Sequence, residues 1–396
     1  MTTEQKIKNL LTRGVEDIIV KESLEKKLKS GKTLTIKLGI DPTSPDLHLG
    51  HAVVLRKLRA FQDLGHTAVL IIGDFTARIG DPSGKSTTRP PLDPTTIEKN
   101  MAEYIFQAGK ILDMDNAEVK YNSEWLEALP FSEIFRLSGL ISVTQMLERN
   151  DFKNRITEGN SIRMHELFYP MMVSYDSVSI KADVELGGND QLFNVLAGRS
   201  LMEKLGMQPQ DILTSSLLVG TDGVEKMSKS LGNYIALTDS ANDMFGKIMS
   251  IKDTLITNYF LLCTDVAESE IELMAEEMEG GANPKEYKMR LASEIVTIYH
   301  GADAADEAQV NFDNTFKKGG MPEDAPEIKV TKGSPLGEVL VEEKIVESKS
   351  EFSRLIKEGA VSVVETEEKI TEREYELTES VNLRIGKKRF VKIIVK

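Results

Sequence analysis

Hydrophobic positions in the first part of the chain switch between helical and strand-like spacing. Apolar residues recur at helical spacing over 4–29, which predicts one helix that ends at Gly31. Residues 33–40 are typical of a strand, 49–64 of a helix with one apolar face, and 67–73 of a strand buried on both faces. A strand, a helix and a second strand in this order predict a right-handed parallel crossover, and therefore an α/β sheet.

The remaining pattern predicts further regions beyond this sheet. Residues 95–160 are mostly helical in pattern, 179–184 are strand-like, and 235–305 are helical throughout. A segment rich in glycine and proline follows, after which two short helices and several strands are expected. We therefore predict a parallel-sheet domain over 1–234, a helical domain with a linker over 235–330, and a small α+β domain over 331–396.

Composition restricts the classes of protein that the chain can belong to. With 40% hydrophobic and 28% charged residues it is an ordinary globular sequence, and we expect neither a membrane span nor a signal peptide. The single cysteine, Cys263, excludes an intrachain disulfide and fits a cytoplasmic protein. The net charge of -14 argues against nonspecific nucleic-acid binding, although the basic residues within 384–396 would allow a local RNA contact.

The tetrapeptide from His48 to His51 stands where a strand and a proline-containing turn lead into a helix. A helix N-terminus attracts phosphate through its free N–H groups and its dipole, and two imidazoles three residues apart add donors on the same side. Gly50 leaves room for a flat base against the backbone. Two surface histidines remain an alternative for this motif alone. A metal site would need Asp41 or Asp46 as a ligand, and we expect no metal there.

A second motif, Lys-Met-Ser-Lys-Ser, places Lys226 and Lys229 in a glycine-rich loop. Such a loop could fold over a triphosphate and bring two ammonium groups to the departing pyrophosphate, whereas a solvated loop is the alternative for this motif alone. Lys85 and Arg89 add positive charge to another loop, whose spacing does not match a Walker A motif. The two motifs in this order favour activation of a carboxylic acid by ATP with loss of pyrophosphate.

Several short segments then occur in a recognisable order. They are Gly39 to Thr43, His48 to His51, Gly80 to Lys85, Tyr169 with Tyr175 and Asp176, Gly187 to Gln191, and Lys226 to Ser230, followed in the tail by Ser348 to Glu351, Arg354 to Ile356 and Gly359 to Val361. In these segments the chain resembles a bacterial tyrosyl-tRNA synthetase, a class I aminoacyl-tRNA synthetase with a C-terminal S4-type RNA-binding module.

The resemblance implies a Rossmann-like catalytic domain, a helical domain that approaches the anticodon, an S4-like domain and a homodimer. It implies ATP with Mg²⁺ as a substrate, no permanent cofactor, L-tyrosine and tRNA(Tyr) as partners, and no membrane. Tyrosine carboxylate would attack the α-phosphorus of ATP, and the terminal ribose of the tRNA would then take the tyrosyl group. Because the carboxylate is already nucleophilic, catalysis would consist of positioning and of stabilising phosphate charge.

The resemblance also implies roles for single residues. The phosphates in the transition state would be contacted by His48, His51, Lys226, Lys229, Lys85 and Arg89. ATP would be bound by Asp41, Thr43, Gly50, Gly188, Asp190 and Lys229. Tyrosine would be bound by Lys37, Gly39, Thr76, Asp81, Tyr169, Val173, Asp176 and Gln191, with Asp176 accepting a hydrogen bond from the phenol. RNA would be bound by Lys349, Arg354, Lys387, Lys388 and Arg389.

Two positions depart from the family pattern and leave alternatives open. Many members have a tyrosine at the position of Lys37, and the family has a glutamine at the position of Val173, where it contacts the substrate amino group. A paralogue with altered amino acid specificity, or a synthetase-derived RNA-binding protein, is therefore an alternative. A tryptophanyl enzyme or a small-molecule adenylyltransferase would lack the tail.

Overall fold

The computed structural model describes residues 2–81, 93–317, 325–364, 366, 368–386 and 389–396. Contacts divide the chain into two compact units. The first contains Met1–Ser240 with Lys247–Tyr299, and the second contains Ala241–Gly246 with His300–Lys396. In the described part of the chain, no helix combines the length and apolar character needed to cross a membrane.

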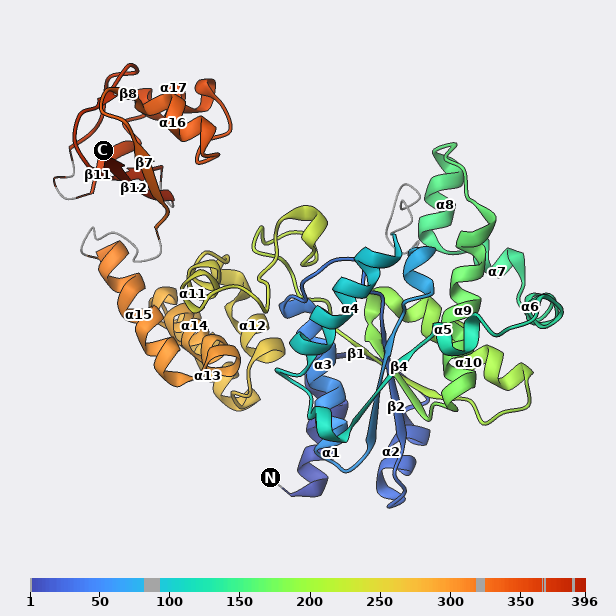
Figure 1. Ribbon diagram of the computed structural model, residues 1–396. Coiled ribbons are helices and arrows are strands. Elements are labelled where there is room, and N and C mark those ends of the chain that lie inside the picture. The colour runs from blue at the N-terminus through green and yellow to red at the C-terminus, as the bar shows by residue number, and fades with distance from the viewer. Residues whose placement is uncertain (1, 82–92, 318–324, 365, 367, 387–388) are drawn as a thin grey trace. The chain divides into compact units, whose positions relative to one another are not determined.

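The first unit is built on a six-stranded sheet with the order β1-β6-β5-β2-β3-β4 in the described residues. Its strands are β1 (Val15–Ile19), β2 (Thr35–Ile40), β3 (Thr67–Ile72), β4 (Ala117–Tyr121), β5 (Val184–Gly188) and β6 (Asp211–Ser215). All neighbours pair in parallel except β1, which runs antiparallel to β6. The predicted α/β class is therefore confirmed, and helices cover both faces of the sheet (Figure 1).

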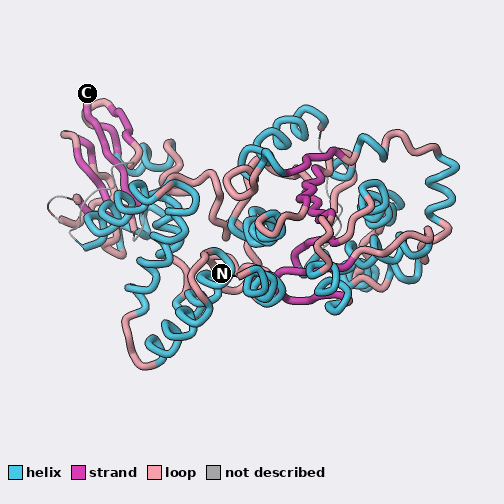
Figure 2. Tube along the Cα trace, turned by 90° about the horizontal axis from the view of Figure 1, so that it is seen from below, coloured by secondary structure: helices cyan, strands magenta, loops and turns pink. Residues whose placement is uncertain are grey.

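Helices connect these strands and follow them along the chain. Around the sheet they are α1 (Thr3–Thr12), α2 (Lys21–Lys29), α3 (Leu49–Gln62), α4 (Pro94–Ala108), α5 (Ser123–Leu126), α6 (Phe131–Ser138), α7 (Val143–Leu147), α8 (Asn150–Thr157), α9 (Met164–Ile180) and α10 (Leu192–Lys204). The later helices are α11 (Ala241–Met249), α12 (Ile256–Cys263), α13 (Glu268–Glu279), α14 (Pro284–His300) and α15 (Ala302–Lys317). The helical pattern expected for 235–305 holds for most of 241–305, whereas 235–240 form a loop before α11. Figure 2 distinguishes helices from strands by colour.

The end of the chain forms a small α+β module, as expected. A four-stranded sheet has the order β7-β12-β11-β9, and a two-stranded ribbon pairs β8 with β10, in the residues described. The elements are β7 (Glu327–Val330), β8 (Ser334–Pro335), α16 (Leu336–Glu342), α17 (Lys349–Lys357), β9 (Val361–Val363), β10 (Glu376–Leu377), β11 (Val381–Ile385) and β12 (Arg389–Val395). Side chains such as Leu340, Phe352, Leu383 and Val391 give this module its own buried core.

Two local expectations are wrong. Residues 4–29 do not form one helix, because Gly14 has a φ of 59° and β1 separates α1 from α2. The strand expected at 179–184 begins only at Val184, because α9 continues to Ile180 and Lys181 then takes a left-handed conformation. Both errors arise where apolar residues satisfy the helical and the strand period equally well.

Candidate active site

A cavity of about 670 Å³ opens at the carboxyl ends of the parallel strands β2 and β5. In an α/β sheet this edge is where ligands bind, because the loops that follow the strands meet there. Most of the residues assigned from the resemblance line it. They are Gly39, Asp41, Thr43, His48, Gly50, His51, Thr76, Asp81, Tyr169, Val173, Asp176, Gly188, Asp190, Gln191 and Lys226.

The two histidines of the first motif lie at the start of α3. His48 is the N-cap residue, and its backbone N–H donates to Nδ1 of His51 over 3.2 Å. The ring centroids are 3.9 Å apart. Burial, together with nearby lysines, lowers the pKa of His48 to about 2 and that of His51 to about 4. Both rings are therefore neutral at physiological pH, and because Nδ1 of His51 accepts, its proton is on Nε2.

The lysine motif contributes another part of the cavity wall, next to the start of α3, because a Cβ atom at Gly50 would lie 3.7 Å from Cβ of Met227. Lys226 lines the cavity and forms an ion pair with Asp190 at 2.8 Å. Lys229 does not line it, and its Nζ instead donates to Ser44 over 3.0 Å and lies 3.3 Å from Asp46. Lys229 thereby ties the motif to the loop that follows β2.

A buried asparagine, Asn233, holds this loop by hydrogen bonds. Oδ1 of Asn233 accepts from the backbone N–H of Ser228 over 2.8 Å, and its Nδ2 donates to Asp222 over 2.7 Å. These contacts fix the conformation of the lysine motif. The other two expected loop cations, Lys85 and Arg89, lie outside the described residues.

Asp41 follows β2 and is held by two hydroxyl groups. Thr76 donates to its Oδ1 over 2.7 Å, and Tyr169 donates to its Oδ2 over 3.0 Å. Burial raises the pKa of Asp41 to about 7, against the effect of the Thr76 hydrogen bond. A neighbouring cation would therefore favour its ionised form.

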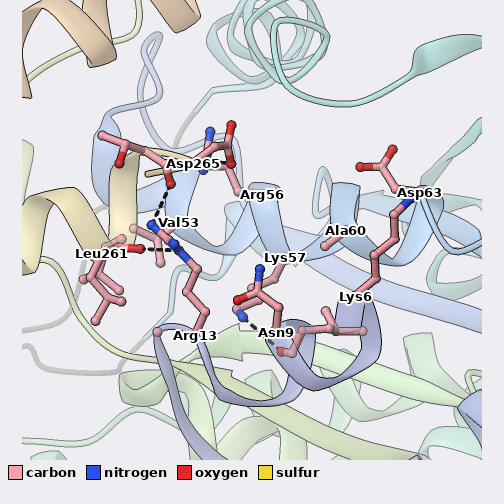
Figure 3. Close-up of a pocket in the computed structure, with 14 residues that line it drawn as sticks. Lys6, Asn9, Arg13, Val53, Arg56, Lys57, Ala60, Asp63, Leu261 and Asp265 are labelled. Atoms are coloured by element: carbon pink, nitrogen blue, oxygen red, sulfur yellow. Dashed lines mark hydrogen bonds and ion pairs between the residues drawn. The ribbon is translucent and has the colours of Figure 1, made fainter. Parts of the chain in front are cut away.

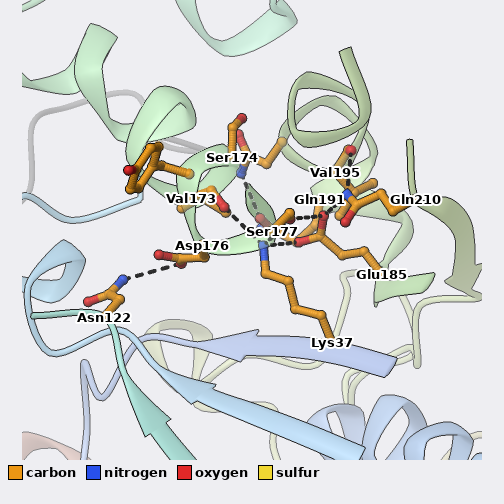
Figure 4. A network of polar contacts seen from close by, with 12 residues as sticks. Lys37, Asn122, Val173, Ser174, Asp176, Ser177, Glu185, Gln191, Val195 and Gln210 are labelled. Carbon is orange, nitrogen blue, oxygen red and sulfur yellow. Dashed lines mark hydrogen bonds and ion pairs between the residues drawn. The ribbon is translucent and has the colours of Figure 1, made fainter. Parts of the chain in front are cut away.

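Helix α9 presents three of the assigned residues on one side. Tyr169, Val173 and Asp176 are spaced by four and three residues, which brings them onto the same helical face. Asp176 accepts from Nε1 of Trp125 over 2.8 Å and from Nδ2 of Asn122 over 3.3 Å. Figure 4 shows the Asp176–Asn122 contact beside the end of the sheet. Burial raises the pKa of Asp176 to about 7, although the charge of Lys37 opposes this.

Asn122 and Trp125 were not expected from the sequence. A signal was available, because Trp125 is the only tryptophan of the chain and both residues follow the end of β4. Trp125 is half-buried, and its N–H finds its acceptor in the buried carboxylate of Asp176.

Lys37 lies beneath the cavity and not in its wall. Its ammonium group is fully buried and contacts Glu185 at 2.6 Å, Oγ of Ser177 at 2.8 Å and the carbonyl of Val173 at 2.9 Å (Figure 4). An ammonium group has three N–H donors, so these partners use all of them. Lys37 therefore acts on the cavity through the Val173 backbone and through its charge near Asp176.

The expected RNA-binding residues lie in the C-terminal module. Lys349 pairs with Glu338 at 2.7 Å on the surface, and Arg354 is exposed near the end of α17. Arg389 is half-buried and donates to the carbonyl of Ile345 over 2.6 Å and to Glu351 over 2.8 Å. Lys387 and Lys388 lie outside the described residues.

A second cavity, of about 250 Å³, lies between α1, α3 and the end of α12 (Figure 3). In its wall, Arg13 donates to the carbonyls of Phe260, Leu261, Thr264 and Val266. These bonds satisfy carbonyls at the C-terminus of α12. The contacts of Arg13 therefore indicate a structural role for this cavity wall.

No group of three His, Cys, Asp or Glu side chains in the described ranges is arranged to hold a metal ion.

The chain is similar to known protein families over most of its length. The family described as tRNA synthetases class I (W and Y) matches residues 29–317. A tyrosine–tRNA ligase from Idiomarina loihiensis is 46% identical over 388 residues, covering 97% of this chain and 96% of that protein. A tyrosine–tRNA ligase from Thermotoga maritima is also 46% identical, covering 99% and 98% respectively.

Solved structures show the same fold. A tyrosyl-tRNA synthetase from Archaeoglobus fulgidus, complexed with L-tyrosine, matches with a TM-score of 0.63 and 21% identity over 78% of this chain and 100% of that chain. A truncated mitochondrial tyrosyl-tRNA synthetase from Aspergillus nidulans matches with a TM-score of 0.65 and 23% identity over 78% of this chain and 94% of that chain. At these identities the likeness concerns the fold.

Proposed function

The chain belongs to the tyrosine–tRNA ligases of the class I aminoacyl-tRNA synthetases, and we propose how its residues carry out that reaction. L-Tyrosine and ATP occupy the cavity at the carboxyl ends of β2 and β5, and tyrosyl-adenylate and pyrophosphate form there. The tyrosyl group then passes to the 3′ end of tRNA(Tyr). The observation that carries this proposal is that the two motifs, which lie far apart in the sequence, meet around one cavity.

In the first step, tyrosine carboxylate attacks the α-phosphorus of ATP and pyrophosphate leaves. Because the rings of His48 and His51 are neutral, they stabilise the phosphate charge by donating N–H hydrogen bonds, and they do not take up a proton. Lys226 and Lys229 exchange their carboxylate partners for phosphate oxygens as negative charge develops. Mg²⁺ enters with ATP as part of the substrate, and no permanent cofactor is required.

The nucleoside lies against the backbone at Gly50 and Gly188. A side chain at Gly188 would place a Cβ atom 2.7 Å from Oδ1 of Asp190, and one at Gly50 would lie 3.0 Å from the His48 ring. Glycine at both positions therefore leaves room beside the ATP-binding residues, with Asp41, Thr43 and Asp190 close to the ribose and phosphates.

The amino acid lies along the face of α9 that lines the cavity. Asp176 accepts a hydrogen bond from the phenol, and Trp125 and Asn122 hold its carboxylate in place. Around the rest of the substrate, Asp81, Tyr169 and Gln191 surround the ammonium group, and Thr76 and Gly39 complete the wall. The side chain of Val173 faces the substrate and gives this part of the cavity an apolar surface.

The other parts of the chain serve tRNA and assembly. We assign 1–234 to catalysis, 235–330 to the approach to the anticodon, and 331–396 to RNA binding through Lys349, Arg354 and the basic segment that ends at Arg389. A homodimer is supported by exposed apolar side chains from α6 to the start of α9. They are Phe131, Phe135, Val143, Ile156 and Met164. A cytoplasmic location fits a tRNA substrate and the single, buried Cys263.

The experiment is charging of tRNA(Tyr) with labelled tyrosine by the purified full-length chain. We expect tyrosyl-tRNA to accumulate only when ATP and Mg²⁺ are both present, and Lys229→Ala to slow its formation. Charging with tyrosine at the level of a no-enzyme control would refute the proposal.

A further inference from the structure

We propose that Arg149 is a positioning residue that sets the direction of a hydrogen-bonded chain of amides, and thereby makes Gln191 donate to Asp81, the carboxylate that meets the ammonium group of the bound amino acid. This inference rests on the proposed function, because it assigns an amino acid to the cavity. Neither Arg149 nor Asn194 belongs to a sequence motif considered above.

The chain runs from the protein interior to the cavity through three hydrogen bonds. NH1 of Arg149 donates to Oδ1 of Asn194 over 3.1 Å, and Nδ2 of Asn194 donates to Oε1 of Gln191 over 2.7 Å. Nε2 of Gln191 then donates to Oδ2 of Asp81 over 2.9 Å. Asn194, Gln191 and Asp81 all line the cavity, and Asn194 is 1% exposed.

The direction of this chain is determined by its two ends. A guanidinium group can only donate hydrogen bonds, whereas an ionised carboxylate can only accept them. Each amide between them has one acceptor oxygen and one donor nitrogen. With Arg149 at one end, the oxygen of Asn194 must face Arg149, its nitrogen must face Gln191, and the nitrogen of Gln191 must face Asp81.

Arg149 itself is held firmly in place. Its side chain is 4% exposed and pairs with Asp151 at 3.0 Å. The guanidinium also lies 5.1 Å from the centroid of the Phe152 ring and 4.9 Å from that of Phe193. A planar cation in contact with two aromatic rings keeps a fixed orientation. The donor that starts the chain is therefore rigid.

The consequence concerns the substrate. With its nitrogen toward Asp81, Gln191 supports the carboxylate that is to meet an ammonium group. If the amides reversed, the oxygen of Gln191 would face the Asp81 carboxylate, and two acceptors would repel each other. Asp81 would then move away from the position in which it binds the ammonium group. The direction of the chain should therefore affect tyrosine binding and leave ATP binding unchanged.

The test is tyrosine-dependent ATP–pyrophosphate exchange with the full-length protein, with KM measured separately for tyrosine and for ATP. Asn194→Asp is the decisive variant, because the introduced carboxylate would keep its contact with Arg149 but could only accept a hydrogen bond from Gln191. We expect KM for tyrosine to rise about tenfold, KM for ATP to stay unchanged, and thermal stability to be retained.

Two further substitution sites separate positioning from packing. Arg149→Met removes the donor and should raise KM for tyrosine, whereas Arg149→Lys keeps a donor-only group and should restore most of the affinity. Glu148→Gln changes an exposed residue next to Arg149 and leaves its ion pair with Asp151 in place, so its KM should stay within about twofold of the parent.

The outcomes are distinguishable. A wild-type KM for tyrosine in Asn194→Asp, or an Arg149→Lys variant as impaired as Arg149→Met, would overturn the inference while the proposed function stands. Absence of tyrosine-dependent exchange in the parent protein would instead overturn the proposed function.

Discussion

Individual residues in the cavity owe their chemistry to burial. His48 and His51 stay neutral because desolvation disfavours their charged forms, and Asp41 and Asp176 hold their protons to a higher pH for the same reason. In the proposed reaction, ATP and the substrate ammonium group would bring charge to a site whose histidines are neutral and whose buried carboxyl groups have raised pKa values. Substitutions at three of the cavity residues test this picture.

The first prediction concerns His51→Ala. In the proposed reaction the N–H donor of His51 stabilises developing phosphate charge, so its loss should slow single-turnover adenylate formation by about 10²–10³-fold with the fold intact. The matched control is His66→Asn, at a histidine that lies outside the cavity wall and accepts from the backbone of Leu34. A single-turnover rate for His51→Ala equal to that of the parent would remove His51 from the catalytic assignment.

The second prediction concerns pH and Asp176. The folded-state pKa of about 7 lies above the ordinary value of 3.8, so the folded protein retains a proton that the unfolded chain releases in this interval. The free energy of unfolding should therefore decrease as pH rises from about 5 to about 7. The slope of the free energy of unfolding against pH should differ between the parent and Asp176→Asn by at most about 1.4 kcal/mol per pH unit.

Urea unfolding at several pH values measures this slope. Asp63→Asn, an exposed substitution on the surface at the end of α3, provides the control and should run parallel to the parent. Parallel curves for the parent and Asp176→Asn would contradict the raised pKa of Asp176.

The third prediction concerns Val173. A valine side chain cannot hydrogen-bond the substrate ammonium, and such a charge-assisted bond contributes roughly 1.5–3 kcal/mol. Val173→Gln should therefore lower KM for tyrosine in the exchange reaction. If tyrosine use does not improve and another amino acid is preferred by the parent, the pocket has an altered specificity.

The sequence was sufficient for residues that lie in motifs, and insufficient for those that act through partners. His48, Lys226 and Gln191 line the cavity as the motifs predict. Trp125 and Arg149 were not predicted, because each contacts a residue far away in the sequence. Trp125 contacts Asp176, 51 residues away, and Arg149 contacts Asn194, 45 residues away. Burial and hydrogen-bond direction depend on that packing and have no local signal.

At the scale of elements, the sequence predicted those helices and strands whose two ends carry turn or capping residues. Helix α3 was expected because a turn, a capping position and a C-terminal glycine frame its apolar face. Strand β1 was missed because it pairs with β6, which follows much later in the chain. Its apolar residues fit a helix equally well until that partner is known.

The element-scale prediction concerns Arg13 and the end of α12. Arg13→Met removes hydrogen bonds from a charged group to carbonyls near that helix end. The free energy of unfolding should therefore fall by roughly 1.5–3 kcal/mol. Urea unfolding gives the change. Arg59→Met removes only an exposed pair with Asp63 and should change stability by less than about 0.5 kcal/mol. Equal losses for both variants would contradict the capping role.

At the scale of the whole molecule, the C-terminal module was expected from the glycine- and proline-rich segment before it. The strand β7, which precedes residue 331, also packs with this module, because β7 pairs with β12 and Ile328 belongs to the module core. A cut directly before residue 331 would therefore divide the module, whereas ending the chain at Gly320 removes it whole.

That truncation gives the prediction at this scale. Tyrosine-dependent pyrophosphate exchange should remain within about twofold of the parent, because the cavity is formed by residues 38–231. Charging of tRNA should fall, and the difference from the parent should shrink as salt increases, since phosphate contacts are weakened by salt. Equal loss of exchange and charging would contradict a separate RNA-binding role.

The central claim is that the cavity activates tyrosine at the expense of ATP. ATP–pyrophosphate exchange, measured with the full-length protein across a panel of all common amino acids, tests it most directly. We expect exchange with tyrosine well above that with phenylalanine or tryptophan, because in the proposed site Asp176, which Trp125 holds by a hydrogen bond, accepts from the phenol. Exchange that is independent of the amino acid, or that is strongest with another amino acid, would contradict it.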